Sequence, residues 1–532
     1  MIFGTRLRHS RGLDGLPVGS VATHSNHISR WFIDLRRGIF GCRWAFDLAP
    51  KRFVAPVHEI NLPVRFHTEN DSMHYPWWYV PQLTAPMLIA AISVVHVLIS
   101  HYAVGGGLFL AVETTHAYRI GNRDYLAYLK RHARFFVLFT IVMGAITGVG
   151  IWWTIGLASP LATQVLIRTF VFGWAIEYVF FLLEIVSAFV FYYYWDRLPQ
   201  KVHLAAVWIY GLSAWASLVI IAAITAFMLD PGTWPVNHCF WAALLNRQSL
   251  PQIIARTGGA LLLGSLYVYL HAAITVRDQK LHGLIESRAT RPALAGAVMI
   301  AAGGALWFLN LPASAQAALL AAPVLNVFMG LLFAVTGIVC FLLILGPCLN
   351  PGWTSGPGFA VSLLFFGIIG FSTSEFIREA VRKPYILYNV VLGNQIFPDE
   401  VARFREKGYL QSGIWTRAFV AKHHPDAIVN GRIDTKRLLV LPREKRVELG
   451  GVIFQHHCND CHAIRLGYAP VGPLVQGWSP QMIRSLVNDL EHTRFTMPPW
   501  SGNGDEAELL TDYLTSIALD RPAGMLPERI RK

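Results

Sequence analysis

Hydrophobic residues form long runs between about residues 86 and 377 of the chain. A helix needs about 20 apolar residues to cross a bilayer, and runs without alternation of period two predict helices rather than barrel strands. Eight runs are long enough: 86–112, 135–155, 166–194, 204–229, 253–276, 293–312, 324–346 and 358–377. We therefore predict an all-α, polytopic membrane bundle of eight helices, followed from about residue 384 by a more polar domain.

Composition and charge agree with a membrane protein. Of the 532 residues, 54% are hydrophobic and 14% are charged, whereas soluble chains carry about 25% charged residues. The net charge of +13 is explained by loops rather than by a nucleic-acid surface. Eleven Lys and Arg residues lie in the loops before the second, fourth and sixth runs, whereas the opposite loops carry only Arg247. The positive-inside rule then predicts a bacterial inner-membrane protein with both termini in the periplasm.

The motif Cys458-Asn-Asp-Cys461-His462 lies in the polar C-terminal part. CxxCH is the attachment motif of c-type haem, in which two thiols bond the haem and the histidine binds its iron. A CxxC pair can also be a redox pair or half of a zinc site. A predicted helix with Gly451 and Phe454 before the motif, and Thr496-Met497-Pro498-Pro499-Trp500 after it, favour haem.

Residues 440–520 thereby resemble a small class I cytochrome c. The resemblance implies that Met497 is the distal iron ligand, and the alternative is a packing methionine. Since haem is attached covalently in the bacterial periplasm, the motif agrees with the topology read from the loops.

Several ionisable residues fall within the predicted membrane helices. Such groups cost about 2.5–3.5 kcal/mol each on insertion scales, so each one indicates a site. A buried imidazole suits a b-type haem, and paired glutamates suit a proton path or a high-spin iron. These residues are His96 and His101, Glu177 and Glu184, and, at the end of the last helix, Glu375, Arg378, Glu379 and Arg382.

The order of these motifs over residues 83–391 resembles subunit I of the cytochrome bd quinol oxidases. The matching segments are Trp174-Ala-Ile-Glu177, Trp195-Asp-Arg-Leu198, Met228-Leu-Asp-Pro231 and Glu379-Ala-Val-Arg382-Lys-Pro384-Tyr385. The resemblance implies one or more b- or d-type haems and a second membrane subunit, with quinone as a further candidate partner.

The resemblance also implies a role for each matching residue. His96 would be an axial ligand of a haem of the active pair, and Glu379 would ligate the high-spin b haem. Arg382 would neutralise a haem propionate. Glu177 and Glu184 would serve the haem pair and its protons as the catalytic acids, whereas His101 stands where the family has a proline.

The chain also departs from that family. Arg256 and Phe328 stand where the family has the histidine and methionine ligands of its low-spin b haem, which makes that haem doubtful here. The long quinol-binding loop is reduced to about 313–323, and a ninth helix is replaced by the motif-bearing domain. Electrons are therefore expected to pass between a periplasmic carrier and the membrane haems through the c haem.

Two functions remain open at this point. The first is an oxidoreductase with a bd-like core, with oxygen as the candidate acceptor. The alternative is a non-oxidase subunit that links a membrane quinone pool to a periplasmic redox enzyme. The expected division is a basic N-terminal segment at 1–72, a membrane domain at 73–391, a linker at 392–440 and a cytochrome c domain at 441–532. We expect translation to start at Met73, so that 1–72 is not translated, and the alternative is that 1–72 is a genuine basic extension.

Overall fold

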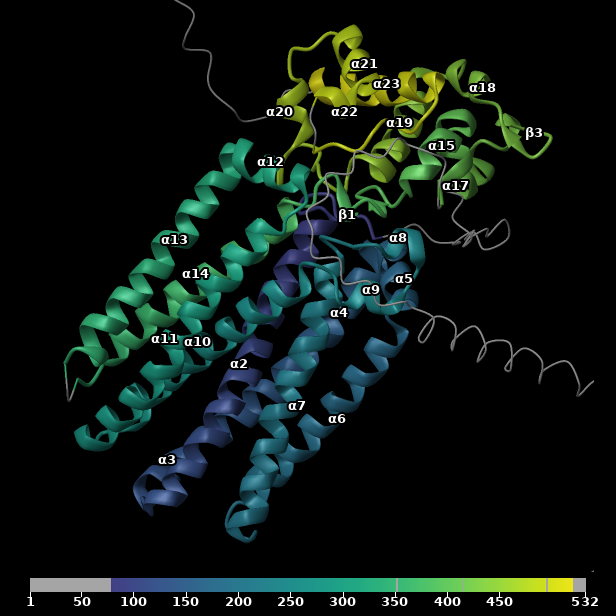
Figure 1. Cartoon of the computed structure of the whole chain (residues 1–532). Helices are drawn as coiled ribbons and strands as arrows, with labels where there is room; N and C mark the ends of the chain where they lie inside the picture. The colour runs from purple at the N-terminus through teal and green to yellow at the C-terminus, as the bar shows by residue number, and fades with distance from the viewer. Residues whose placement is uncertain (1–77, 351–352, 414, 494–495, 520–532) are drawn as a thin grey trace, which may run out of the picture.

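The structure, a computed structural model, describes residues 78–350, 353–413, 415–493 and 496–519. The expected extension 1–72 and the candidate start at Met73 lie outside these ranges. The described residues form a bundle of long helices and a helical C-terminal domain that sits at one end of the bundle (Figure 1).

Eight helical segments in the described ranges are long and apolar enough to cross a membrane, which confirms the predicted all-α, eight-span architecture. Two of the spans are composite, because a π-helical turn joins α3 to α4 and another extends α13. The spans are α2 (Ala85–Ile120), α3–η1–α4 (Arg123–Leu138, Phe139–Met143, Gly144–Ala158), α6 (Val171–Tyr193), α7 (Gln200–Phe227), α10 (Ser249–Thr275), α11 (Gln279–Leu309), α13–η2 (Pro323–Leu343, Ile344–Cys348) and α14 (Pro357–Ala380).

The helix ends differ from the apolar runs for identifiable reasons. The second span begins at Arg123, because α3 is amphipathic and its polar first turns continue beyond the apolar run. The third run is divided, since the separate helix α5 (Pro160–Thr169) ends just before Phe170. Helix α11 passes through Pro292, where the sequence pattern predicted a helix start. Hydropathy thus located the spans, but not the polar turns that extend them.

The two ends of the bundle carry different connections. The short helices α5, α8 (Trp234–Asn237), α9 (Phe240–Leu244) and α12 (Ala313–Ala321) lie at the same end as the C-terminal domain (Figure 1). The loops rich in Lys and Arg lie at the opposite end, before α3, α7 and α11. The motif-bearing domain therefore sits at the end of the bundle that carries few basic residues.

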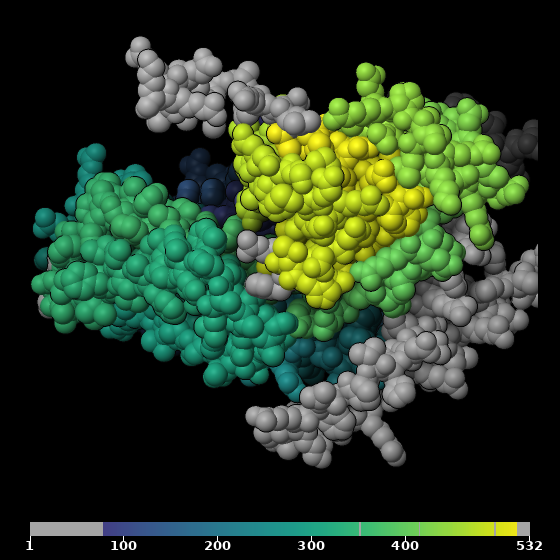
Figure 2. Space-filling view, turned by 90° about the horizontal axis from the view of Figure 1, so that it is seen from above, coloured from purple at the N-terminus to yellow at the C-terminus, as the bar shows by residue number. Residues whose placement is uncertain are grey.

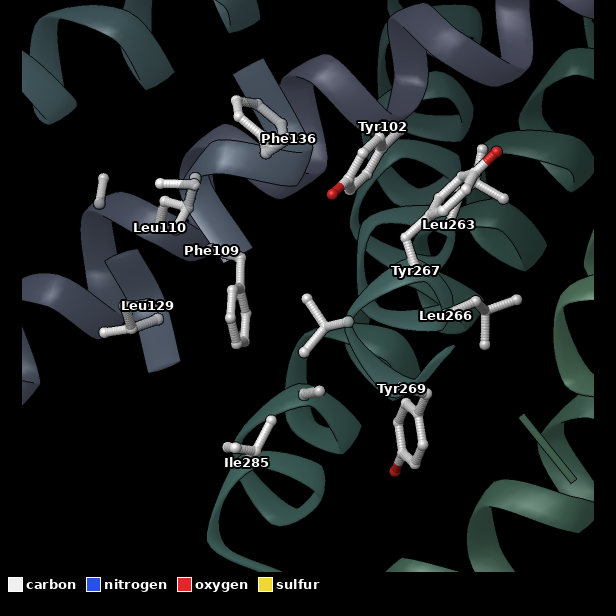
Figure 3. Close-up of a cluster of buried hydrophobic side chains, with 14 of the residues drawn as sticks. Tyr102, Phe109, Leu110, Leu129, Phe136, Leu263, Leu266, Tyr267, Tyr269 and Ile285 are labelled. Atoms are coloured by element: carbon white, nitrogen blue, oxygen red, sulfur yellow. The ribbon is translucent and has the colours of Figure 1, made fainter. Parts of the chain in front are cut away.

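The core of the bundle is aromatic where α2, α3 and α10 meet (Figure 3). The rings of Tyr102 and Tyr267 stack with centroids 4.2 Å apart, and Phe136 meets Tyr102 edge-on at 5.1 Å. All three side chains are buried or nearly so. Such pairs contribute roughly 0.5–1.5 kcal/mol each beyond their buried area, so they hold α2, which carries His96, against its neighbours.

The C-terminal domain consists of short helices and two small hairpins. The hairpins pair β1 (Tyr385–Leu387) with β2 (Val391–Leu392) and β3 (Ile428–Val429) with β4 (Arg432–Ile433). The helices are η3 (Pro398–Glu400), α15 (Val401–Lys407), α16 (Tyr409–Ser412), α17 (Thr416–His423), η4 (Pro425–Ala427), α18 (Thr435–Leu439), α19 (Arg443–His457), α20 (Val471–Val475), α21 (Pro480–Asn488), α22 (Leu490–Thr493) and α23 (Gly504–Leu519).

Residues 392–440, expected as a linker, are folded into this domain. Tyr409, Leu410 and Leu438 are fully buried in the same core as Phe454 and Leu509. The segment places its apolar side chains on short helices that cover the motif-bearing part, although its mixed charge suggested an exposed connection. Seen from above, the domain covers one part of the bundle and leaves α13 to one side (Figures 1 and 2).

Candidate functional site

The CxxCH motif forms one tight turn at the end of α19. The amide of Cys458 still donates to the carbonyl of Phe454 at 2.8 Å, which continues the helix into the motif. The amides of Cys461 and His462 both donate to the carbonyl of Cys458, at 3.0 and 2.9 Å. Neither cysteine forms a disulfide bond. The two thiols and the imidazole are therefore held on one turn of backbone, as attachment of a single haem requires.

The ring of His462 is oriented by a backbone carbonyl. Its Nδ1 lies 2.8 Å from the carbonyl oxygen of Ala469, which can only accept, so Nδ1 carries the proton. Nε2 is then the nitrogen left to bind a metal. Burial lowers the pKa of His462, which favours the neutral ring that ligates iron. These residues fit the proximal side of a c-type haem.

Met497, the expected distal ligand, is half-buried in the loop between α22 and α23. The nearby Trp500 ties this loop to the motif, because its ring packs on His457 at 5.2 Å and on Tyr409 at 5.6 Å. Met497 is thus carried by a loop that is packed against the residue preceding Cys458. Its role as an iron ligand remains a prediction.

Helices α19 and α23 cross at backbone contact, and Gly450 makes this possible. A Cβ atom on Gly450 would lie 2.1 Å from the carbonyl oxygen of Leu509. The sequence reading selected Gly451, whose added Cβ would meet the ring of Tyr513 at 3.2 Å. The crossing fixes the end of α19, and therefore the position of the motif.

A buried polar network supports the motif from the segment expected to be a linker. Nδ1 of His457 is hydrogen-bonded to the hydroxyl of Tyr409 and lies 3.0 Å from the amide nitrogen of Asn394. Glu506 accepts hydrogen bonds from the backbone amides of Tyr409 and Leu410, at 2.7 and 2.8 Å. Burial raises the pKa of Glu506 to about 7, against the effect of these bonds. No sequence motif marks these residues, so their role could not be predicted from the sequence alone.

In the bundle, the two histidines of α2 face different neighbours. Nδ1 of His96 lies 3.0 Å from the hydroxyl of Thr147 on α4, which leaves Nε2 as its candidate ligand atom. Nδ1 of His101 lies 2.9 Å from the carbonyl of Val97, and its ring meets Phe371 of α14 edge-on at 5.2 Å. The structure therefore does not gather the two rings into one site.

The two acids of α6 both face α7. Glu177 accepts a hydrogen bond from Ser217 at 2.8 Å, and Glu184 accepts one from Tyr210 at 3.2 Å. The two partners on α7 have the same seven-residue spacing as the two glutamates, in the reverse order. That matched spacing was present in the sequence and could have identified Tyr210 and Ser217 as partners.

Charged residues gather at the end of α14. Arg382, 1% exposed, pairs with Glu379 and donates to the carbonyl of Ile386. Glu375 accepts from Arg378 at 2.8 Å and lies 3.2 Å from the guanidinium of Arg256 on α10.

Phe328 of α13 lies 4.5 Å from Phe376, measured between ring centroids. The two positions where the low-spin haem ligands were missing, Arg256 and Phe328, are therefore engaged in ion-pair and aromatic contacts.

The loop of the motif lies against the start of α2. The side-chain amide of Asn459 donates to the carbonyl of Val80 at 3.5 Å, and the amide of Tyr468 donates to that of Gln82 at 2.9 Å. Gly467 has a φ of +120°, and a Cβ atom there would lie 2.0 Å from the carbonyl oxygen of Gln82. The loop that carries the motif is therefore in direct contact with the start of the membrane bundle.

Comparisons with known proteins concern the bundle. The family described as cytochrome bd terminal oxidase subunit I matches residues 85–311. Among solved structures, the bd oxidase from Geobacillus thermodenitrificans aligns with a TM-score of 0.47 at 17% identity, over 58% of this chain and 89% of that one. No curated protein sequence matches the chain. The part of the membrane bundle between residues 85 and 311 is therefore similar to subunit I of the cytochrome bd terminal oxidases.

Proposed function

We propose that this chain is a membrane-bound electron-transfer protein of the bacterial inner membrane, an oxidoreductase or a subunit of one. Its bd-like core would exchange electrons with a periplasmic carrier through a c-type haem bound to Cys458 and Cys461. Both termini would lie in the periplasm, and a second membrane subunit would complete the assembly.

The observation that carries this proposal is the docking of the motif loop on the bundle. The loop contacts residues 80–82 at the start of α2. Gly393, which follows β2, also lies close to the motif, because an added Cβ there would be 3.9 Å from Asp460. A haem on the motif would therefore sit beside the end of the bundle that carries Glu379 and Arg382, which suits electron exchange within one chain.

The residues of the motif have separable roles. A c-type haem supplies reversible one-electron transfer when it is bound. Cys458 and Cys461 would hold it covalently, and His462 would present Nε2 to its iron because Ala469 holds Nδ1. Met497 would provide a soft thioether ligand, which favours ferrous iron.

The residues of the bundle would serve its haems and protons. His96 and Glu379 are the proposed iron ligands, and Arg382, which pairs with Glu379 in this structure, would offset a propionate charge. Glu177 and Glu184 would hold and move protons, since each is hydrogen-bonded to a hydroxyl group of α7. Cofactors would thus be haem c and one or more b- or d-type haems.

A second candidate function is favoured by one observation. Arg256 is paired with Glu375, and Phe328 is packed on Phe376, at the positions of the missing low-spin haem ligands. A core with fewer haems suits a non-oxidase subunit that links a quinone pool to a periplasmic redox enzyme.

Spectra and oxygen uptake of the purified protein separate these functions. An oxidase is expected to show a chlorin-type band or a carbon-monoxide-reactive b haem, with cyanide-sensitive oxygen uptake from a reduced periplasmic carrier. Low-spin b and c bands alone, without oxygen uptake, would instead support the second function. The Cys461→Ser variant is the control for the route of electrons, and undiminished uptake from the carrier in that variant would contradict entry through the c haem.

A further inference from the structure

Lys383 brings a positive charge from the end of α14 to the CxxCH motif. It follows Arg382 directly and comes four residues after Glu379. Its ammonium group is buried, and the next residue, Pro384, accepts a hydrogen bond from the amide of Gly393 at 2.9 Å. A Cβ atom added to Gly393 would lie 3.9 Å from the carboxylate of Asp460 in the motif. A residue of the membrane part therefore reaches the side of the motif at which haem would be attached.

Burial of this charge costs free energy unless the ammonium group has an oppositely charged or hydrogen-bonding partner. An ammonium group removed from water loses its hydration, and only an opposite charge or hydrogen bonds offset that loss. Asp460 is the acidic group that faces it, is 5% exposed, and has one carboxylate oxygen without a hydrogen-bond partner among the described residues. The cation therefore lies in a region of low dielectric constant, where its electrostatic interactions with nearby charges are stronger than in water.

We infer that Lys383 is a positioning residue that tunes the c-type haem from the membrane part of the chain. This inference rests on the proposed function, because it requires haem at Cys458 and Cys461. Ferrous haem carries one positive charge less than ferric haem, so a fixed cation beside the motif stabilises the reduced form. Lys383 would therefore raise the reduction potential of the c haem.

The sequence position of Lys383 gives this charge a further consequence. Lys383 and Glu379 are about one helical turn apart in sequence. The same short segment would therefore hold a membrane haem through Glu379 and set the potential of the c haem through Lys383. The relative potentials of the two haems, and so the distribution of electrons between them, would depend on this segment.

The test is a redox titration of the c haem in the purified full-length protein, comparing wild type with Lys383→Gln. Loss of the charge should shift the equilibrium towards ferric haem about tenfold, a fall of about 59 mV for one electron. Lys383→Arg should restore a potential near that of wild type. Lys445→Gln is the matched control, because Lys445 is an exposed lysine of the same domain paired with Glu448, and its potential should not change.

Two further readouts separate the possible failures. The methionine–iron absorption band should be unchanged in Lys383→Gln, because an electrostatic effect leaves the iron ligands in place, whereas a purely structural role would alter it. If wild type carries no covalently bound haem, the proposed function fails. If the haem is attached and Lys383→Gln has the wild-type potential, the inference about Lys383 alone is wrong.

Discussion

Arg256 of α10 and Glu375 of α14 form an ion pair inside the bundle, with Nη2 and Oε1 3.2 Å apart. Their side chains are only 15% and 12% exposed, and Glu375 also accepts from Arg378 at 2.8 Å. The pair joins two helices at the position where a haem ligand is expected in the family that the bundle resembles. If the correspondence predicted from the sequence is correct, an ion pair stands here instead of a haem ligand.

Arg256→Ala should destabilise the bundle, because it leaves the buried carboxylate of Glu375 with one cation instead of two. Breaking a buried ion pair costs about 3–5 kcal/mol, and the remaining Arg378 should keep the loss at the lower end of this range. Thermal unfolding in detergent measures the effect.

Lys130→Ala is the matched control for this variant. It removes an ion pair with Asp196 in which both side chains are well exposed, so its expected cost is about 0–1 kcal/mol. Equal losses in the two variants would show that the Arg256 pair has no special structural role.

The Met497→Ala variant tests the distal ligand of the proposed c haem. Loss of a thioether ligand disfavours ferrous iron, so the reduction potential should fall. The redox equilibrium should shift towards ferric haem at least about tenfold. The methionine–iron absorption band should disappear as well. Met482→Ala serves as the control, because that side chain is 52% exposed on α21. An unchanged band in Met497→Ala would leave Met497 as a packing residue.

Hydropathy and one motif predicted a large part of this molecule. The eight spans follow from the length of the apolar runs, which depends on bilayer thickness and not on tertiary detail. The turn at Cys458–His462 is also local, so its sequence suffices to identify it.

Contacts between distant segments could not be read in the same way. Glu506 accepts hydrogen bonds from the backbone amides of residues 409 and 410. Since almost every residue has a backbone amide, the residue types at these positions do not predict this contact. Lys383 reaches the CxxCH motif only because the chain returns to the end of α14 after about 75 residues. Residues 392–440 were expected as a linker because their mixed charge hides the few apolar positions, such as Leu410 and Leu438, that fill the core.

Glu506 should make the stability of the C-terminal domain depend on pH. Burial raises its pKa from 4.5 to about 7 in the folded protein. The folded state then holds a proton that the unfolded state releases between these values, so stability is fully present below about pH 4.5 and is lost as pH rises through about 7. The expected loss over the whole range is roughly 3 kcal/mol.

Tryptophan fluorescence during thermal unfolding at pH 5 and pH 8 measures this dependence. Glu506→Gln cannot ionise, so its stability should change less between the two pH values than that of wild type. Glu508→Gln, on the same helix but in an exposed pair with Arg484, should behave as wild type. A pH dependence that is the same in all three proteins would place the responsible group elsewhere.

Gly450→Ala should disrupt the packing of α19 against α23, which holds the CxxCH motif in place. The added methyl carbon would lie 2.1 Å from the carbonyl oxygen of Leu509, and this oxygen belongs to the backbone of α23, so neither helix can yield without separating the crossing. Overpacking of this kind costs typically about 1–3 kcal/mol and more where backbone must shift.

The neighbouring glycine provides the matched control for this crossing. In Gly451→Ala the methyl carbon would meet the ring edge of Tyr513 at 3.2 Å, and a side chain can move by a few tenths of an ångström. We expect Gly450→Ala to lower protease resistance of residues 443–519 and covalent haem content together, while Gly451→Ala keeps both near wild type. Since the two substitutions add the same methyl group one residue apart, equal behaviour would mean that the helix crossing does not determine how the motif is held.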